Sequence, residues 1–80
     1  MVLPEAIEGY LREKLPCEHL AVAGDGAHFE AVIVSDAFAG KSRVARHQLV
    51  YAALGERMRE EIHALSMQTL TPAEWAARQP

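Results

Sequence analysis

The stretch from His28 to Tyr51, HFEAVIVSDAFAGKSRVARHQLVY, constrains the fold more than any other part of the chain. Its first residues are apolar or aromatic on both alternating faces except at Glu30, which is typical of a central strand. Gly40 then interrupts the run, and Ser42 is suited to cap a following helix. The stretch therefore predicts a strand with both faces largely covered, then a glycine loop, then a helix.

The helix after this loop is expected over about residues 42–55. Val44, Tyr51 and Leu54 recur at helical spacing, with His47 or Gln48 between them. These residues mark one face of the predicted helix.

The segment before this stretch predicts a helix and a strand. Apolar side chains recur every four residues over 3–15, which indicates an amphipathic helix; they are Leu3, Ile7, Leu11 and Leu15. A short strand is expected over 20–23. The turn Gly24-Asp25-Gly26 then joins it to an antiparallel strand over 28–35, because glycine tolerates positive φ and aspartate bonds its own backbone.

The segment after the helix predicts one further strand and one further helix. Residues 56–62 supply another turn or two of helix, and His63 opens a strand over 64–69. Thr71-Pro72-Ala73-Glu74 is a capping box with proline at the first helical position. It predicts a short C-terminal helix that carries Trp75.

The order of these elements, αββααβα, defines the fold class. A tight turn cannot join parallel strands, whereas a helical crossover can, so the third strand is expected to run parallel to the second. The sequence thus predicts a single α+β domain over residues 1–80, with helices packed on a mixed three-stranded sheet.

Composition narrows the functional classes. The formal net charge of −3 argues against strong nonspecific binding to nucleic acid. No apolar run reaches the roughly 18 residues of a membrane helix, and the N-terminus does not resemble a secretory signal. The lone cysteine, Cys17, fits a reducing compartment, so we expect a cytoplasmic protein without membrane association.

The sequence contains only a partial match to a motif of nucleotide-binding enzymes. The segment SDAFAGKS from Ser35 to Ser42 nearly matches a phosphate-binding loop, but Ser35 replaces the first glycine. A true phosphate loop also needs a larger parallel α/β domain. No nucleophile, base and orienting group occur together, so we expect the chain not to be an enzyme.

Four histidines raise the question of a metal site. His28 follows the predicted turn, His63 precedes the third strand, and His19 lies near Cys17 at the start of the first strand. No pair has the local spacing of a closed metal site. The spacing alone therefore favours the ordinary interpretation, with surface imidazoles at His19 and His28 and a cation at a helix C-terminus for His63.

Three basic residues, Lys41, Arg43 and Arg46, cluster at the start of the middle helix. They are either phosphate contacts or solvated charges around a loop. No aromatic residues are interleaved with them, so the sequence gives no support for base stacking.

Two segments resemble the signature of one family. GDGAHFEAVIVSDAFAGKSRVARHQLVY and, further along, IHALSMQTLTPAEW resemble the BolA family, in particular its bacterial members with a Gly-Asp-Gly turn. The resemblance spans residues 3–76. It implies a fold similar to class II KH domains, αββααβ with a terminal helix, which agrees with the order above.

The resemblance also implies two functions. One is partnership with monothiol glutaredoxins of the Cys-Gly-Phe-Ser type in iron–sulfur cluster trafficking or assembly. The family's ligands in that role map onto His63 and, between the first two strands, onto His28, with Cys17 and His19 as substitutes. The alternative is DNA binding and transcription regulation of stress or envelope genes, which maps onto Lys41, Arg43 and Arg46.

Ligand counting favours a shared cluster in the first function. A [2Fe–2S] cluster needs four ligands, and histidine can replace cysteine on one iron. One cysteine and dispersed histidines cannot supply these alone. We therefore expect no cofactor in the isolated chain, and a cluster completed by a glutaredoxin cysteine and glutathione in the complex.

Overall fold

The computed structural model describes residues 2–79, and its elements follow the predicted order αββααβα. They are α1 (Pro4–Lys14), β1 (His19–Gly24), β2 (His28–Val34), the short 3₁₀ helix η1 (Asp36–Phe38), α2 (Arg43–Leu54), α3 (Arg57–Glu60), β3 (Ala64–Leu70) and α4 (Pro72–Arg78). Only η1 was not expected, because the sequence predicted a loop there.

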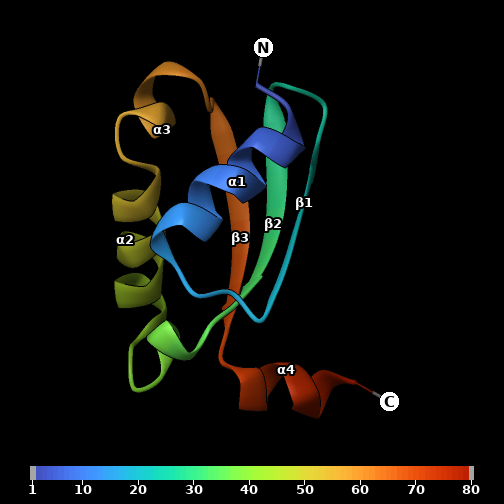
Figure 1. Cartoon of the computed structure of the whole chain (residues 1–80), viewed down its shortest axis with the longest axis vertical. Coiled ribbons are helices and arrows are strands. Elements are labelled where there is room, and N and C mark those ends of the chain that lie inside the picture. Colours follow the sequence, from blue (N-terminus) through green and yellow to red (C-terminus); the bar gives the residue numbers. More distant parts are fainter. Residues whose placement is uncertain (1, 80) are drawn as a thin grey trace.

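The sheet has the order β1-β2-β3, with β2 in the middle. β1 and β2 are antiparallel and β2 and β3 are parallel, which confirms the predicted mixed sheet. In the register, His28 pairs with Ala64 at one end, and Val34 pairs with both His19 and Leu70 at the other. Figure 1 shows the starts of β2 and β3 at the top and α4 below the opposite end.

The predicted helix boundaries have the expected causes. The Ser42 hydroxyl accepts a hydrogen bond from the Ala45 amide at 3.2 Å, and Thr71 and Glu74 form the complete capping box. Gly55 ends α2 with a φ of 59°, which a residue with a side chain rarely adopts. These local signals fix where α2 and α4 begin and where α2 ends.

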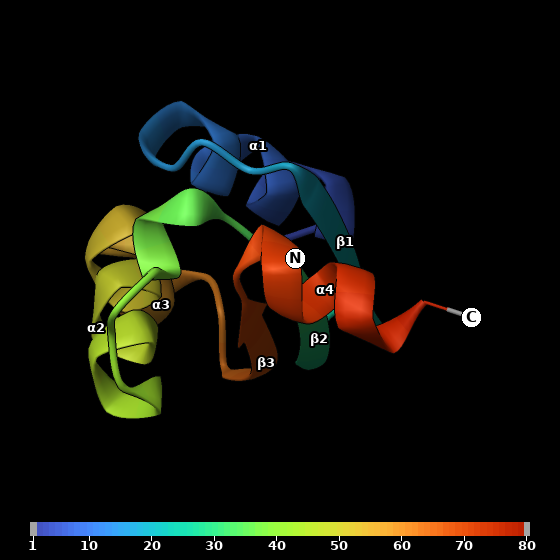
Figure 2. The same cartoon turned by 90° about the horizontal axis from the view of Figure 1, so that it is seen from below.

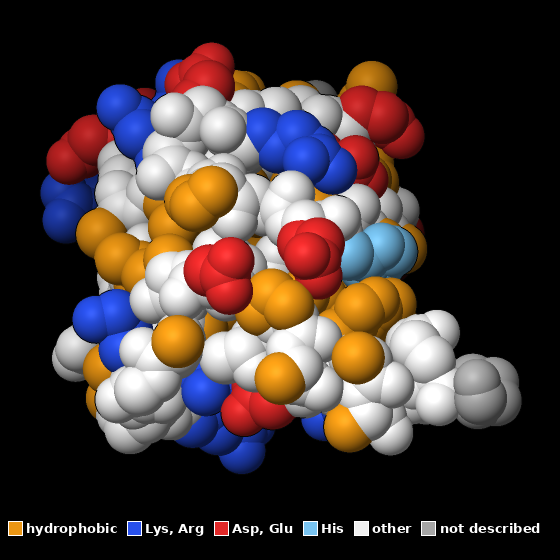
Figure 3. Space-filling view, turned by 60° about the horizontal axis from the view of Figure 1, so that its bottom comes forward, with side chains coloured by type: hydrophobic (Ala, Val, Ile, Leu, Met, Phe, Trp, Pro, Cys, Tyr) orange, Lys and Arg blue, Asp and Glu red, His pale blue; other side chains and the backbone are white. Residues whose placement is uncertain are grey.

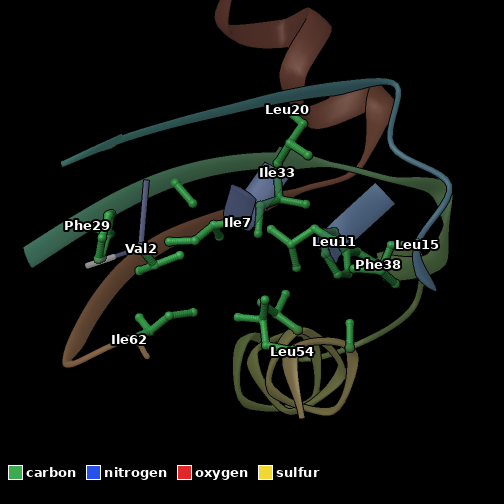
Figure 4. Packing of buried hydrophobic residues seen from close by; sticks show 13 residues of the cluster. Val2, Ile7, Leu11, Leu15, Leu20, Phe29, Ile33, Phe38, Leu54 and Ile62 are labelled. Atoms are coloured by element: carbon green, nitrogen blue, oxygen red, sulfur yellow. The ribbon is translucent and has the colours of Figure 1, made fainter. Parts of the chain in front are cut away.

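The core lies between one face of the sheet and the helices. Figure 2 shows α1 and α2 on the same side of the sheet. Phe29, Ala31 and Ile33 of β2 point into this layer and are buried. Figure 4 shows Val2, Phe29 and Ile62 at one end of the core, with Leu11, Leu15 and Phe38 toward the other. Burial of these side chains is the main stabilising contribution to the fold.

The opposite face of the sheet is open, which corrects the prediction that β2 is covered on both faces. Glu30 is exposed and Val32 is half-buried, and on this face of β2 only Val34 is fully buried, at the end near α4. The reason is that the larger helices all lie on one side, while α4 reaches one end of the sheet only. β2 is therefore central in the sheet but covered on one face.

The prediction of which face of α2 is buried is also wrong in part. Val44 is 66% exposed and Tyr51 is 43% exposed, whereas Leu54 is fully buried. The helix instead buries Val50 and Ala53 beside Leu54. Two apolar stripes fit the helical period here, and only packing against α1 and the sheet selects between them.

Within residues 2–79, no helix is long and apolar enough to cross a lipid bilayer.

Candidate functional site

Two histidines lie at the same end of the sheet, as the parallel pairing of β2 and β3 predicts. His28 is the first residue of β2 and pairs with Ala64, and His63 directly precedes Ala64. Both histidines are exposed. We call this end, comprising His28, His63 and the turn 25–27, the histidine edge.

The turn before β2 holds the backbone of His28. The Asp25 carboxylate accepts hydrogen bonds from the amides of Ala27 and His28, both at 2.9 Å, and the Asp25 amide donates to the His28 carbonyl at 3.2 Å. Gly26 adopts a φ of 98°, which the turn requires. The amides of His28 and Ala27 lower the pKa of the Asp25 carboxyl, so these bonds are made by a carboxylate near neutral pH.

Neighbouring contacts hold the chain at His63. Ile62 is 3% exposed and anchors the preceding residue in the core. The Tyr10 hydroxyl of α1 donates to the Glu61 carboxylate at 3.2 Å, and the Arg57 guanidinium lies 4.0 Å from the centre of the Tyr10 ring. α3 is thereby tied to α1, so the exposed His63 is presented from a fixed backbone.

A hollow of about 510 Å³ opens at the histidine edge. His63 lines it together with the turn 25–27 and with Glu60 and Glu61. His28 lies beside the hollow; on β2 it alternates with the buried Phe29, so it faces the same side as the exposed Glu30. The two histidines thus share this end of the sheet, but only His63 lines the hollow.

The donor set at this edge is incomplete by itself. Among the described residues, no group of three or more His, Cys, Asp or Glu side chains is placed to hold a metal ion. Histidine can replace cysteine on one iron of a [2Fe–2S] cluster, so a cluster at this edge would need its remaining ligands from another molecule.

The expectation that Cys17 or His19 can substitute at this site is wrong. His19 pairs with Val34, at the opposite end of β2 from His28. Six residues of strand separate these ends, which corresponds to about 20 Å. Cys17 lies two residues before His19 and precedes β1, so both residues lie at the end of the sheet opposite the histidine edge.

Cys17 is also poorly suited to metal binding or nucleophilic chemistry. It is half-buried, and burial raises the pKa of its thiol, an effect that the Arg12 guanidinium partly opposes. Since the thiolate is the reactive form, this environment favours an inert side chain.

The three basic residues of the alternative prediction have different environments. Lys41 and Arg43 are exposed at the mouth of a groove of about 730 Å³ between α2, β3 and α4. Arg46 lies in the same groove, but its side chain is only 13% exposed. Figure 3 shows Lys and Arg side chains, with an acidic one among them, along the lower edge of the molecule. The three basic residues therefore do line one groove, but only Lys41 and Arg43 are exposed to solvent.

Arg46 anchors α4. Its guanidinium forms an ion pair with Glu74 at 2.7 Å and donates to the backbone carbonyls of Thr69 and Lys41, both at 3.0 Å. No residue of α4 is fully buried, so this helix depends on such polar contacts more than on apolar packing. Most donor capacity of Arg46 is thus used inside the protein and not for a ligand.

The attachment of α4 is expected to weaken in acid. Hydrogen bonds from Arg46, followed by the amide of Thr71, lower the pKa of Glu74 from 4.5 to about 2. Because the folded-state pKa is the lower one, this stabilisation is present above pH 4.5 and is lost as the pH falls toward 2. Amide protection factors, the ratios of the exchange rate in the unfolded chain to that in the protein at the same pH, should therefore fall in α4 over this range before they fall in β2. Fluorescence of the single tryptophan, Trp75, should change with them.

Glu74→Gln is the matched control for this prediction. It keeps the side-chain shape but removes the titrating group, so the protection factors of α4 should be lower at neutral pH and change little further in acid. Equal protection of α4 and β2 throughout the titration of the wild-type protein would contradict an anchoring role for the ion pair.

An aromatic contact at the α4 end escaped the sequence analysis. The rings of His19 and Trp75 are stacked, with centroids 4.5 Å apart and planes 16° from parallel. The residues are 56 positions apart, and only the register of β1 against β2 brings His19 to α4. This contact places His19 in a structural role at the end opposite the histidine edge.

Comparisons with known proteins agree with this fold. Residues 11–74 match the family model described as BolA-like protein. The acid stress protein IbaG of Escherichia coli is 42% identical over 71 residues, which cover 88% of this chain and 84% of that protein. The DNA-binding transcriptional regulator BolA of Escherichia coli is 39% identical over 61 residues, or 76% of this chain and 58% of that protein.

Solved structures give the same result. The structure of a bolA protein homologue from Coxiella burnetii superposes with a TM-score of 0.87 at 42% identity. The alignment covers 95% of this chain and 99% of that one. Sequence and architecture thus agree over most of both chains, and the protein belongs to the BolA-like family.

Proposed function

We propose that this chain is a non-enzymatic adaptor that binds a monothiol glutaredoxin of the Cys-Gly-Phe-Ser type and shares a [2Fe–2S] cluster with it. The observation that carries the proposal is the histidine edge, where the exposed His28 begins β2 and the exposed His63 directly precedes the parallel strand β3. Family membership supports the choice of this function over an isolated metal site.

The chemistry of the shared site follows from ligand counting. A [2Fe–2S] cluster takes four ligands, and two imidazoles can replace two thiolates on one iron. His28 and His63 would hold that iron, while a glutaredoxin cysteine and the thiol of glutathione would hold the other. Imidazole in place of thiolate raises the reduction potential of such clusters, so the adaptor would alter cluster reactivity without turning over a substrate.

Co-purification tests this function. The chain and a Cys-Gly-Phe-Ser glutaredoxin would be produced together and isolated with glutathione under anaerobic conditions. We expect a one-to-one complex whose visible absorption and circular dichroism differ from those of the cluster on glutaredoxin alone. A glutaredoxin cluster spectrum unchanged by this chain would overturn the proposal.

DNA binding is the second candidate, favoured by the exposed Lys41 and Arg43 beside the groove. A relative named as a DNA-binding transcriptional regulator supports it. Arg46, the third predicted contact, is paired with Glu74, so any phosphate contacts would depend mainly on the other two residues.

The double variant Lys41→Ala/Arg43→Ala should abolish most DNA binding if this second function is correct. Loss of two phosphate contacts lowers the slope of log affinity against log salt by about two for duplex DNA. Titration of a labelled duplex at several salt concentrations measures this slope. Arg12→Ala/Lys14→Ala on α1 removes the same charge elsewhere and is the control. Equal affinity of both double variants would remove Lys41 and Arg43 as contacts.

A further inference from the structure

The outer edge of β3 carries backbone groups that do not face β2. In a parallel pair, alternate residues direct both N–H and C=O toward the neighbouring strand. The Leu70 carbonyl accepts from the Ser35 amide at 2.9 Å on the β2 side, whereas the Thr69 carbonyl accepts from Arg46 on the other. Met67 has the same parity as Thr69, so its backbone N–H and C=O also face outward.

In the part of the chain that the structure describes, some of these outward groups have no partner outside the sheet; Met67 is half-buried, and Thr69 is only 8% exposed. Among the described residues, no hydrogen bond reaches the N–H or C=O of Met67, or the N–H of Thr69, from outside the sheet. An unpaired strand edge is a template for another strand. On the other edge strand, β1, the Val22 amide donates to the Glu8 carboxylate at 3.2 Å. Within residues 2–79, each edge strand thus has one outward backbone group bonded to a side chain, and on β3 the outward groups of Met67 are without such a partner.

This edge forms the floor of the groove between α2 and α4, whose lining includes residues 67–70 of β3. Lys41, Arg43 and Arg78 line the groove as well. Its one carboxylate, Glu74, is neutralised by Arg46 at 2.7 Å. The groove is thus basic in a chain whose net charge is −3.

We propose that this groove binds an extended acidic peptide segment of a partner protein, which adds beside β3 as a fourth strand. In antiparallel pairing, one residue of the peptide would exchange two hydrogen bonds with Met67. The N–H of Thr69 would supply the next donor along the edge. Main-chain bonds supply affinity in this mode of recognition, and carboxylates beside Lys41 and Arg43 supply selectivity.

The lining favours a peptide over the other occupants. Single-stranded nucleic acid binds by stacking bases on aromatic rings, but no Phe, Tyr or Trp lines the groove, and Trp75 is stacked on His19. A second copy paired edge to edge would bring two basic rims together. An acidic peptide strand would form hydrogen bonds with the unpaired backbone groups of β3, and its carboxylates would pair with the basic side chains of the groove.

This site is separate from the histidine edge and goes beyond the proposed function. Thr69 lies six residues from His63 along β3, a distance of about 20 Å. The metal site would then lie at the start of β3, and the peptide would bind along the second half of the same strand.

A designed peptide tests the proposal. The probe is a capped, labelled heptapeptide in which glutamate alternates with valine. Its control has the same sequence with N-methyl groups on the amides that would pair with β3. We expect the unmodified peptide to bind at low salt, to shift the Met67 and Thr69 amides and to protect them from exchange. The N-methylated peptide should bind at least about tenfold more weakly, because it lacks the main-chain donors.

Protein variants complete the test. Lys41→Ala/Arg43→Ala should weaken peptide binding about tenfold, while Arg12→Ala/Lys14→Ala should leave it unchanged. Equal affinity for both peptides, or absence of binding, would overturn strand addition. Displacement of the peptide by single-stranded DNA of higher affinity would assign the groove to nucleic acid instead. A dimer formed through β3 without peptide would assign it to a second copy.

Discussion

Gly24→Ala should destabilise the protein by about 3 kcal/mol, as expected when a side chain is forced into closely packed surroundings. A Cβ at this position would lie 2.5 Å from the His28 carbonyl oxygen and 2.5 Å from Cδ1 of Phe29. Neither group can yield easily, because Phe29 is 1% exposed and the His28 carbonyl accepts the Asp25 amide. The turn before β2 must therefore move.

Gly9→Ala is the matched control. A Cβ there meets no atom within 4 Å, and Gly9 lies on the exposed side of α1. Alanine stabilises an exposed helical position by up to about 1 kcal/mol relative to glycine. Urea denaturation of both variants gives the two free energies of unfolding. Similar stability of Gly24→Ala and wild type would show that the close contact at the end of β1 is not maintained in solution.

His63→Ala should have the largest effect on the proposed cluster. Loss of residues that merely orient metal ligands already weakens metal binding about 10- to 100-fold, so loss of a ligand should reduce cluster occupancy at least as strongly. Because His63 is exposed, the free energy of unfolding should stay near that of wild type. His63→Cys should retain a cluster with a changed spectrum, since thiolate is also a ligand.

Three further variants test which end of the sheet supplies the cluster ligands. His28→Ala should also impair the cluster, because neither Cys17 nor His19 lies near enough to replace it. Cys17→Ala and His19→Ala should leave the cluster spectrum unchanged, although His19→Ala should loosen α4 through loss of the Trp75 stack. The visible spectrum of each glutaredoxin complex, with circular dichroism as the folding control, measures these effects. A normal cluster in folded His63→Ala would refute the ligand assignment.

Local signals in the sequence were sufficient to predict most of the architecture. Ser42 and the Thr71–Glu74 capping box determine helix starts through contacts within three residues, so spacing alone reveals them. The crossover from β2 to β3 also forced the parallel pairing that brings His28 and His63 to one edge. Both deductions depend on chain geometry and not on long-range packing.

Other features depend on packing that spacing does not encode. The burial of Val50 instead of Val44 follows from the rotation of α2 against the sheet, and one face of β2 is open because no large helix crosses it. The role of Arg46 depends on Glu74, 28 residues away. The sequence therefore grouped Arg46 with Lys41 and Arg43, although its side chain holds α4.

Detection of a histidine nitrogen bonded to iron tests the central claim most directly. The chain would be produced with histidine carrying a heavy nitrogen isotope, combined with unlabelled glutaredoxin and glutathione, and the cluster reduced for pulsed electron paramagnetic resonance. We predict strong hyperfine coupling to the labelled nitrogens of His28 and His63. His63→Ala should weaken this coupling, His28→Ala/His63→Ala should remove it, and Cys17→Ala and His19→Ala should leave it intact. A reduced cluster in the complex without coupling to labelled histidine would contradict the claim that this chain supplies ligands to a shared cluster.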